Sequence, residues 1–277
     1  MSLTVARALA DARALGLARL DAQLLLAHQL QRSRTWLIAH DEAELSAAQA
    51  QAFASDCRSR AAGEPLAYLV GRWTFCGLEL QVTPAVLVPR PETELLVEWA
   101  LQLLAGPLTD LPTPAVLDLG TGSGAIALAV KQSWPQARIS ASDASGSALA
   151  VARANADRLG LDLALAAGDW WQAAGDQRFD LALSNPPYIA GADPHLAALA
   201  HEPRQALTPG GDGLDAIRCI VAGAAAHLNP VGWLLFEHGH DQDAAVRALL
   251  AGAGFDAIAT RHDLAGLARC TGGRWPG

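Results

Sequence analysis

The sequence contains few cysteines, and none is arranged to hold a metal ion. The four, Cys57, Cys76, Cys219 and Cys270, include no C-x-x-C pair and have no histidine at ligand spacing, which is typical of free thiols in a reducing compartment. Residues 237–241 contain two histidines, but alternate residues at a strand end face one side, and no second group of ligands is evident. We therefore expect no metal site.

A long uninterrupted apolar stretch is also missing. The longest uncharged segment, residues 219–236, is interrupted by His227 and Pro230, which argues against a membrane span. Asp11 and Asp21 lie among the apolar residues at the N-terminus, where a signal peptide would have a cationic start and an unbroken apolar run. We expect a cytoplasmic protein with no membrane partner.

Basic residues are in the minority. The chain has 28 acidic and 20 basic residues, a formal net charge of −8. Residues 1–75 hold eight arginines and seven acidic residues, a net of +1, so the remainder carries −9. A protein that binds duplex nucleic acid normally presents a basic surface. Nucleic acid is therefore disfavoured as a direct substrate.

The hydrophobic pattern divides the chain into three parts. In residues 1–73, apolar residues such as Leu17 and Leu20 recur at helical spacing, which predicts a small helical bundle. Residues 74–88 alternate apolar residues with breakers, which predicts a β-hairpin linking two domains. In residues 89–277, apolar runs alternate with amphipathic stretches, which predicts an α/β fold with a mainly parallel sheet covered on both faces. The expected strands are residues 116–119, 138–142, 163–166, 179–184, 233–237, 257–261 and 268–271, and the expected helices include 148–159 and 242–251.

The tetrapeptide Asn185-Pro186-Pro187-Tyr188 directly follows an apolar run. An amide or exocyclic amino nitrogen is a poor nucleophile because its lone pair is delocalised, so orientation must supply much of the rate. The side-chain oxygen of Asn185 and the carbonyl of Pro186 can each accept one N–H of an –NH2 group, and the ring of Tyr188 can pack on its flat face. We predict an active site that methylates a planar nitrogen, with Asn185 and Pro186 catalytic and all four residues contacting the substrate.

A glycine-rich loop follows the first expected strand of the α/β domain. A loop of this kind brings backbone close to a ligand, and the helix that it opens offers free N–H groups. Its G-x-G-x-G spacing indicates a nucleotide-like ligand without saying which one. Asp143 ends the next strand, where a carboxylate can take both ribose hydroxyls of an adenosine. Asp169 and Trp170 follow the third strand and offer an acceptor and a ring for a base. The loop residues are Gly120, Thr121, Gly122, Ser123 and Gly124.

Several motifs together make the chain resemble the bacterial N5-glutamine methyltransferases that modify peptide chain release factors. The resemblance covers nearly the whole length, and the segment Pro89-Arg90-Pro91-Glu92-Thr93-Glu94 discriminates this family from nucleic-acid amino-methyltransferases. The matching stretches are residues 63–71, 88–94, 117–124 and 184–189, with Glu202-Pro203 and Glu237-His238-Gly239. His201 departs from the family pattern, because a phenylalanine often precedes Glu-Pro there.

The resemblance implies a class I methyltransferase domain, residues 89–277, whose last strand is antiparallel. It also implies a substrate-recognition role for residues 1–73, S-adenosylmethionine as cofactor, and release factors as protein partners. Carried over by position, the glycine loop would line the methionine part, Asp143 the ribose, and Asp169 with Trp170 the adenine. Residues 185–188 would hold the glutamine of a Gly-Gly-Gln loop, with Asn185 also contacting the cofactor.

Two other functions remain open from the residues themselves. An amino-methyltransferase acting on adenine or cytosine in nucleic acid would use the same four residues from Asn185 to Tyr188, but it should need a basic face. A nucleotide-binding regulatory or redox protein of the Rossmann type would explain the glycine loop. That second alternative does not explain the tetrapeptide from Asn185 to Tyr188.

Overall fold

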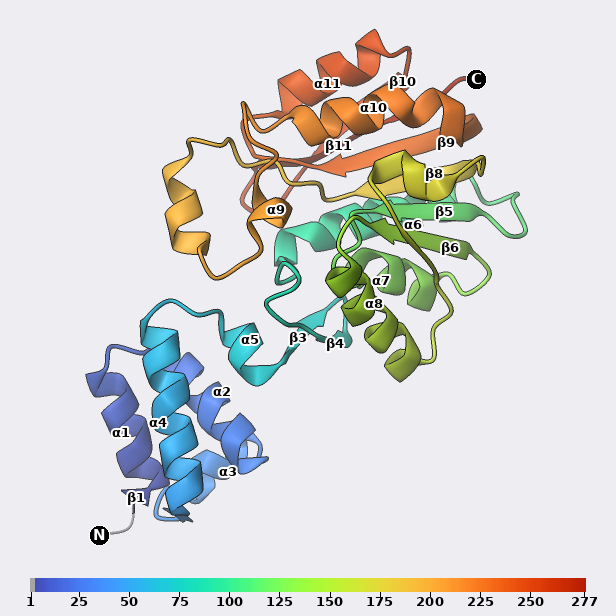
Figure 1. Ribbon diagram of the computed structural model, residues 1–277. Coiled ribbons are helices and arrows are strands. Elements are labelled where there is room, and N and C mark those ends of the chain that lie inside the picture. The colour runs from blue at the N-terminus through green and yellow to red at the C-terminus, as the bar shows by residue number, and fades with distance from the viewer. Residues whose placement is uncertain (1–2) are drawn as a thin grey trace. The chain divides into compact units, whose positions relative to one another are not determined.

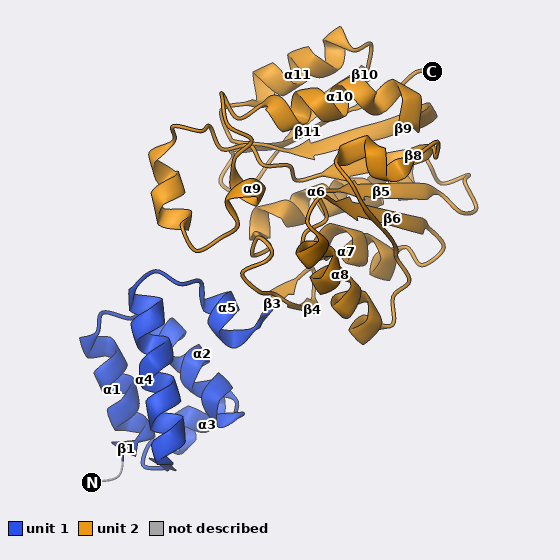
Figure 2. Ribbon diagram, in the orientation of Figure 1, with its two compact units in different colours: residues 1–72 blue, residues 73–277 orange. Residues whose placement is uncertain are grey.

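The computed structural model describes residues 3–277. The chain divides into two compact units, one ending at Arg72 and one beginning at Trp73 (Figure 2). Each has its own hydrophobic core.

The first unit is helical. Ser46 begins the longest of its helices with a capping box, in which its side chain accepts from Gln49 N and the Gln49 side chain accepts from Ser46 N. Leu25 and Leu26 are fully buried, whereas Leu20, which the helical spacing had suggested for the same face, is 48% exposed. The elements are β1 Leu3–Thr4, α1 Val5–Ala14, α2 Arg19–Leu30, α3 Arg34–Ala39, β2 Glu44–Leu45, α4 Ala47–Ala61 and α5 Leu66–Val70.

The second unit is built on a seven-stranded sheet with the order β10-β11-β9-β8-β5-β6-β7 (Figure 1). Only β11 runs antiparallel to its neighbours. All five residues of β5 are buried, as a central parallel strand covered on both faces requires. The strands are β5 Ala115–Leu119, β6 Arg138–Asp143, β7 Ala164–Ala167, β8 Phe179–Ser184, β9 Leu228–Glu237, β10 Asp256–His262 and β11 Ala268–Arg274. The predicted α/β fold and its antiparallel last strand are confirmed.

Helices cover both faces of this sheet. Residues of α6 and α7 pack with Val116 and Leu181 on one face, and residues of α10 and α11 pack with Leu117 and Ala182 on the other (Figure 1). The α-helices are α6 Glu94–Ala105, α7 Ala125–Ser133, α8 Gly146–Leu159, α9 Arg204–Leu207, α10 Asp215–His227 and α11 Asp243–Gly252, and the 3-10 helices are η1 Pro91–Thr93, η2 Trp170–Ala174 and η3 Pro194–Leu199. Within the described part of the chain, no helix combines the length and apolar character needed to cross a bilayer.

The expected linker hairpin is part of the second unit's core. Its strands are β3 Arg72–Phe75 and β4 Leu78–Gln81, shorter and earlier than the predicted range. The turn residues Cys76 and Gly77 both have positive φ, +46° and +75°, as a two-residue turn of type I′ requires. Phe75 and Leu80 are buried against the helices of the sheet, because alternate residues of the hairpin are apolar.

Candidate active site

A cavity of about 330 Å³ opens where β5, β6, β7 and β8 end. The carboxyl ends of parallel strands share one edge of a sheet, so residues that follow different strands meet there. The lining residues at or after the ends of these strands are Gly120, Thr121, Gly122, Ser123, Asp143, Ala144, Ser145, Gly168, Asp169, Trp170, Asn185 and Pro187. Ala85, Val86, Leu87, Pro89 and Thr93 from the segment before α6, Ala125, Ile126 and Ala148 from α7 and α8, and Pro203, Gln205 and Ala206 around α9 complete the wall.

Backbone hydrogen bonds and neighbouring side chains fix the glycine loop, since the amides of Gly120 and Thr121 both donate to the carbonyl of Ser142 at 2.9 Å. Gly120 has φ +76°, and a Cβ placed there would meet the ring of Trp170 at 3.5 Å. A Cβ on Gly124, φ +83°, would lie 3.1 Å from Leu128 and 3.3 Å from Ala152. Around Gly122, by contrast, a Cβ would meet nothing within 4 Å. The loop is therefore packed tightly at Gly124, in ordinary contact with Trp170 at Gly120, and open around Gly122, which lines the cavity.

Asp143 supports the loop and still has capacity to bind. Its Oδ2 accepts from Gly122 N at 2.9 Å, and its Oδ1 accepts from Ser145 N at 2.8 Å. A carboxylate oxygen can accept more than one hydrogen bond, so both oxygens keep a lone pair for hydroxyl groups in the cavity.

Asp118, the fourth of the five residues of β5, supports the site, and sequence reasoning missed it. Its side chain is fully buried, and burial raises the pKa of this carboxyl to about 7. Oδ2 accepts from Thr121 Oγ1 at 2.6 Å and from Ala127 N at 3.2 Å, whereas Oδ1 has no hydrogen-bond partner among the described residues. One carboxyl thus links the glycine loop to the first turn of α7. The available signal was an acidic residue inside an otherwise apolar strand.

Asn185 is oriented by a residue far away in the sequence. Its Nδ2 donates to Thr93 Oγ1 at 3.1 Å, so its amide nitrogen is engaged and its oxygen Oδ1 is left to accept. Thr93 is 3% exposed and ends η1. It lies within residues 88–94, one of the stretches that match the family. The structure therefore presents Asn185 Oδ1 as a hydrogen-bond acceptor at the wall of the cavity, with the amide nitrogen fixed by Thr93.

Tyr188 points toward a buried carboxylate. Its Oη donates to Glu237 Oε1 at 3.1 Å, and burial raises the pKa of the Tyr188 hydroxyl above its usual range. Burial also raises the pKa of Glu237, to about 6, against the lowering effect of the hydrogen bond from Tyr188. The hydroxyl is therefore a donor at neutral pH, and it anchors the ring.

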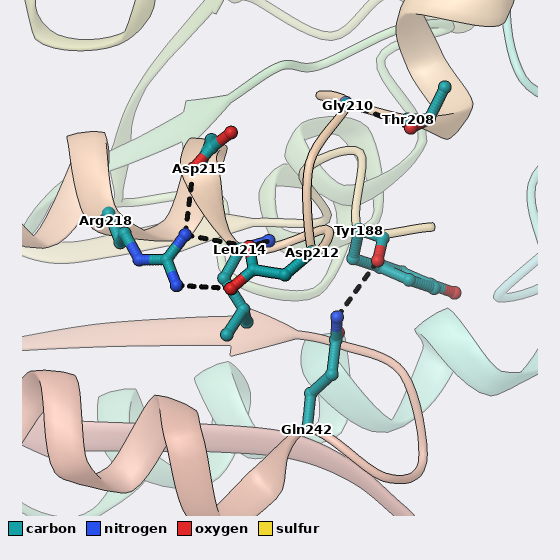
Figure 3. Close-up of polar contacts among 8 residues, drawn as sticks. All are labelled: Tyr188, Thr208, Gly210, Asp212, Leu214, Asp215, Arg218 and Gln242. Carbon is teal, nitrogen blue, oxygen red and sulfur yellow. Dashed lines mark hydrogen bonds and ion pairs between the residues drawn. The ribbon is translucent and has the colours of Figure 1, made fainter. Parts of the chain in front are cut away.

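The backbone after Asn185 is held by a residue of the loop between β9 and α11. Gln242 Nε2 donates to the carbonyl of Tyr188 at 3.0 Å, as Figure 3 shows, while Gln242 Oε1 accepts from Gly239 N at 2.9 Å. Gly213 leaves the room that this carbonyl needs, because a Cβ there would lie 2.2 Å from Tyr188 O. The strand end and the loop that follows it are thus fixed to each other.

The chain between Ile189 and Gly211 forms a long loop whose two ends are joined by backbone hydrogen bonds. Ile189 N donates to Leu207 O at 2.9 Å, and Gly191 N donates to Gly211 O at 3.1 Å. Inside this loop Glu202 is 7% exposed; its Oε1 pairs with Arg90 Nη2 at 2.5 Å. Its Oε2 accepts from Val88 N at 3.1 Å. Glu202 therefore ties the loop to residues 88–90, and Pro89 of that segment also lines the cavity.

The structure brings most of the predicted site residues to this cavity. Gly124, Pro186 and Tyr188 are not among the lining residues: Gly124 begins α7, Pro186 is buried, and Tyr188 reaches Glu237. Those that line it are Gly120, Thr121, Gly122, Ser123, Asp143, Asp169, Trp170, Asn185 and Pro187.

Comparison with known proteins gives concordant matches for both units. A family model described as the PrmC N-terminal domain matches residues 3–71, and one described as the methyltransferase small domain matches residues 96–214. The curated release factor glutamine methyltransferase of Burkholderia pseudomallei is 52% identical over 275 residues, covering 96% of this chain and 95% of that protein. The one from Xylella fastidiosa strain Temecula1 is 50% identical over 262 residues, 94% of each chain.

Solved structures resemble the chain in fold. The Thermus thermophilus 16S rRNA N2 G1207 methyltransferase, in complex with AdoMet and guanosine, has a TM-score of 0.54 at 21% identity, covering 74% of this chain and 49% of that one. A methyltransferase from Pyrococcus furiosus has a TM-score of 0.53 at 18% identity, covering 73% of this chain and 90% of that one. The sheet described above is thus that of class I methyltransferases.

Proposed function

The chain belongs to the release factor glutamine methyltransferase family, and from this membership we propose what its cavity does. The protein is an S-adenosylmethionine-dependent enzyme that methylates a protein glutamine. It transfers the methyl group to the side-chain amide nitrogen, N5, of the glutamine in the Gly-Gly-Gln motif of peptide chain release factors. The orientation of Asn185 carries the proposal, because its amide nitrogen is bound to Thr93 and its amide oxygen is left to accept from an incoming –NH2 group.

The cofactor side of the cavity fits S-adenosylmethionine. Both oxygens of Asp143 keep lone pairs for the two ribose hydroxyls, and Trp170 with Asp169 lines the part where an adenine would lie. The open space around Gly122 admits the methionine part, which the glycine loop would line from Gly120 to Gly124. Bound there, S-adenosylmethionine supplies an electrophilic methyl group on sulfur.

On the acceptor side, Asn185 Oδ1 and the carbonyl of Pro186 each accept one N–H of the glutamine amide. This fixes the plane of the amide and turns a face of the nitrogen toward the methyl group. As the nitrogen gains positive charge, the two oxygens become better acceptors, so they stabilise the transition state more than the ground state. The transfer is direct, and no side chain of the enzyme forms a covalent bond with the methyl group.

Methylation of adenine or cytosine in nucleic acid is not favoured. The curated relatives are named for a protein substrate, and the residues after position 75 carry a net charge of −9. A nucleic-acid enzyme would need a basic face to bind phosphates.

The test is to incubate the protein with methyl-labelled S-adenosylmethionine and an unmodified release factor. Two controls are run in parallel. One is a release factor whose motif is changed to Gly-Gly-Ala, and the other is duplex DNA. We expect one added methyl group on the glutamine of the unmodified factor, located by peptide mass spectrometry, and none on the other two. Label on the altered factor or only on DNA would reject the proposed acceptor.

A further inference from the structure

Asn155 is a polar residue in a fully buried position. It lies on α8 with 0% of its surface exposed. Its Oδ1 accepts from Gln81 N at 2.6 Å, and its Nδ2 donates to Gln81 O at 3.0 Å and to Ser123 O at 2.9 Å. Because a backbone N–H only donates and a carbonyl only accepts, these partners determine which end of the amide is which. The side chain thus has one orientation, and both hydrogens of Nδ2 are used.

The partners of Asn155 belong to two segments that are far from it in the sequence. Gln81 ends β4 of the hairpin, 74 positions before Asn155, and Ser123 belongs to the glycine loop, 32 positions before it. The hairpin begins at Arg72, the residue at which the first unit ends. Helix α8 lies beside β4 (Figure 1). One side chain therefore connects the hairpin that follows the first unit to the loop that lines the cavity.

The carbonyl of Ser123 lies between two glycines, where the backbone has the most freedom to turn. Gly122 and Gly124 have positive φ, +54° and +83°, and glycine adopts either sign of φ at little cost. The peptide plane between Ser123 and Gly124 is held at both ends. Its carbonyl accepts from Asn155, and Gly124 N donates to Thr121 O at 2.9 Å. Without the Asn155 side chain, hydrogen bonding would hold this plane at its N–H end alone.

The orientation of this plane affects the shape of the cavity wall. Ser123 lines the cavity and is 3% exposed, and the neighbouring Gly122 N is bound to Asp143 Oδ2. A turn of the plane would move Ser123 relative to the cavity and would strain the bond between Gly122 and the carboxylate proposed for the ribose. Asn155 itself is not among the residues that line the cavity. It can therefore act on a ligand there only through the loop.

We propose that Asn155 is a positioning residue for cofactor binding: it holds the peptide plane between Ser123 and Gly124 in the form that receives S-adenosylmethionine, and it ties this plane to the end of β4. The inference rests on the proposed function, because it takes the glycine loop as the site of the methionine part. Since one side chain serves both segments, a ligand that orders the loop also orders the end of β4, and the coupling is reciprocal.

The first test compares Asn155→Ala and Asn155→Leu with the wild-type protein. Both remove the three hydrogen bonds, and leucine also fills the volume of the lost side chain. Arg158→Met is the matched control: Arg158 lies on the same helix and donates to the carbonyl of Glu79 in β4, so its loss affects the hairpin without removing the contact with the loop. Calorimetry gives the S-adenosylmethionine affinity, thermal unfolding gives the stability, and steady-state methylation gives kcat and the KM for the cofactor.

We expect both Asn155 variants to bind S-adenosylmethionine about 10-fold more weakly, the effect of losing one well-oriented hydrogen bond. The KM for the cofactor should rise with it, while kcat at saturating cofactor should change less than about twofold, because Asn185 and Pro186 are unaltered. Arg158→Met should lose stability but keep its affinity within about twofold. Unchanged affinity in both folded Asn155 variants, or an equal loss in Arg158→Met, overturns the proposal. Calorimetry needs no release factor, so this outcome is independent of the proposed acceptor.

A second measurement tests the coupling in the wild-type protein. Saturating S-adenosylmethionine should slow hydrogen exchange at Gln81 N, which donates to Asn155. Ala115 N, which donates to Asp180 at the start of β5, reports how far the cofactor stabilises the fold as a whole. We expect Gln81 N to slow at least about 5-fold more than Ala115 N, the low end of typical coupling between sites. Equal slowing at the two amides overturns the inference, even if the Asn155 variants do not fold.

Discussion

Substitution of Asp118 by asparagine should change how the stability of the protein depends on pH. Burial raises the pKa of the Asp118 carboxyl from 3.8 to about 7. Between these two pKa values, the folded protein keeps the Asp118 proton, whereas the unfolded chain has already lost it. The stability that the protonated carboxyl contributes is thus complete below pH 3.8 and is lost as pH rises to about 7.

The magnitude follows from the difference between the two pKa values. One pKa unit corresponds to about 1.4 kcal/mol, so the complete loss is about 4 kcal/mol, and about 3 kcal/mol of it falls between pH 5 and 8. Asparagine does not titrate. The free energy of unfolding of Asp118→Asn minus that of the wild type should therefore rise by about 3 kcal/mol over this range.

The assay is urea unfolding followed by tryptophan fluorescence at pH 5, 6, 7 and 8. The amide places an –NH2 group where Oδ1 lacks a partner, which adds a constant cost that cancels in the pH dependence. Asp162→Asn removes a carboxylate from an exposed position and is the control. A difference between Asp118→Asn and wild type that stays flat from pH 5 to 8 would refute the reasoning.

Four further outcomes are expected. Asn185→Ala should lower kcat roughly 100-fold to 1,000-fold in methylation assays with S-adenosylmethionine affinity nearly unchanged, because the lost contact acts mainly in the transition state. Asp143→Ala should instead weaken cofactor binding about 10-fold or more in calorimetry, since it removes two acceptors and the support of the glycine loop. Gly120→Ala should destabilise the fold by about 1–2 kcal/mol in thermal unfolding, because a side chain at this positive φ is strained. Glu202→Gln should raise the KM for the release factor, and the effect should be absent in a background that already lacks Arg90; additive effects would argue against the ion pair as its cause.

The fold was predictable from the sequence because its signals are local. Runs of apolar residues marked each strand of the sheet within a few positions; β8 was predicted with its observed bounds, residues 179–184. The helical spacing of apolar residues in the first unit predicted that this unit is helical, but it did not predict which face of each helix is buried. Leu20 fits the spacing, yet it is exposed because α2 buries Leu25 and Leu26 instead.

The supporting contacts of the site were not predictable in the same way. Asn185 and Thr93 are 92 positions apart, and Glu202 and Arg90 are 112 positions apart. Such pairs meet only when the sheet and the loop have formed, so no spacing in the sequence reveals them. Residues that follow strands were easier to foresee, since topology alone brings their positions to one edge of the sheet. Thr93 and Glu202 lie in matching motifs, which gave their place without their contacts.

The hydrogen bonds that join the ends of the loop between Ile189 and Gly211 affect how the sequence of such an enzyme can change. Its hydrogen bonds and the anchor at Glu202 fix the parts that line the cavity, whereas η3 in between buries none of its residues. Lengthening a loop whose ends are already closed adds little entropic cost. Insertions and substitutions around η3 can therefore accumulate while the chemistry next to it stays constant, and this stretch of chain is where new substrate preferences can arise without loss of methyl transfer.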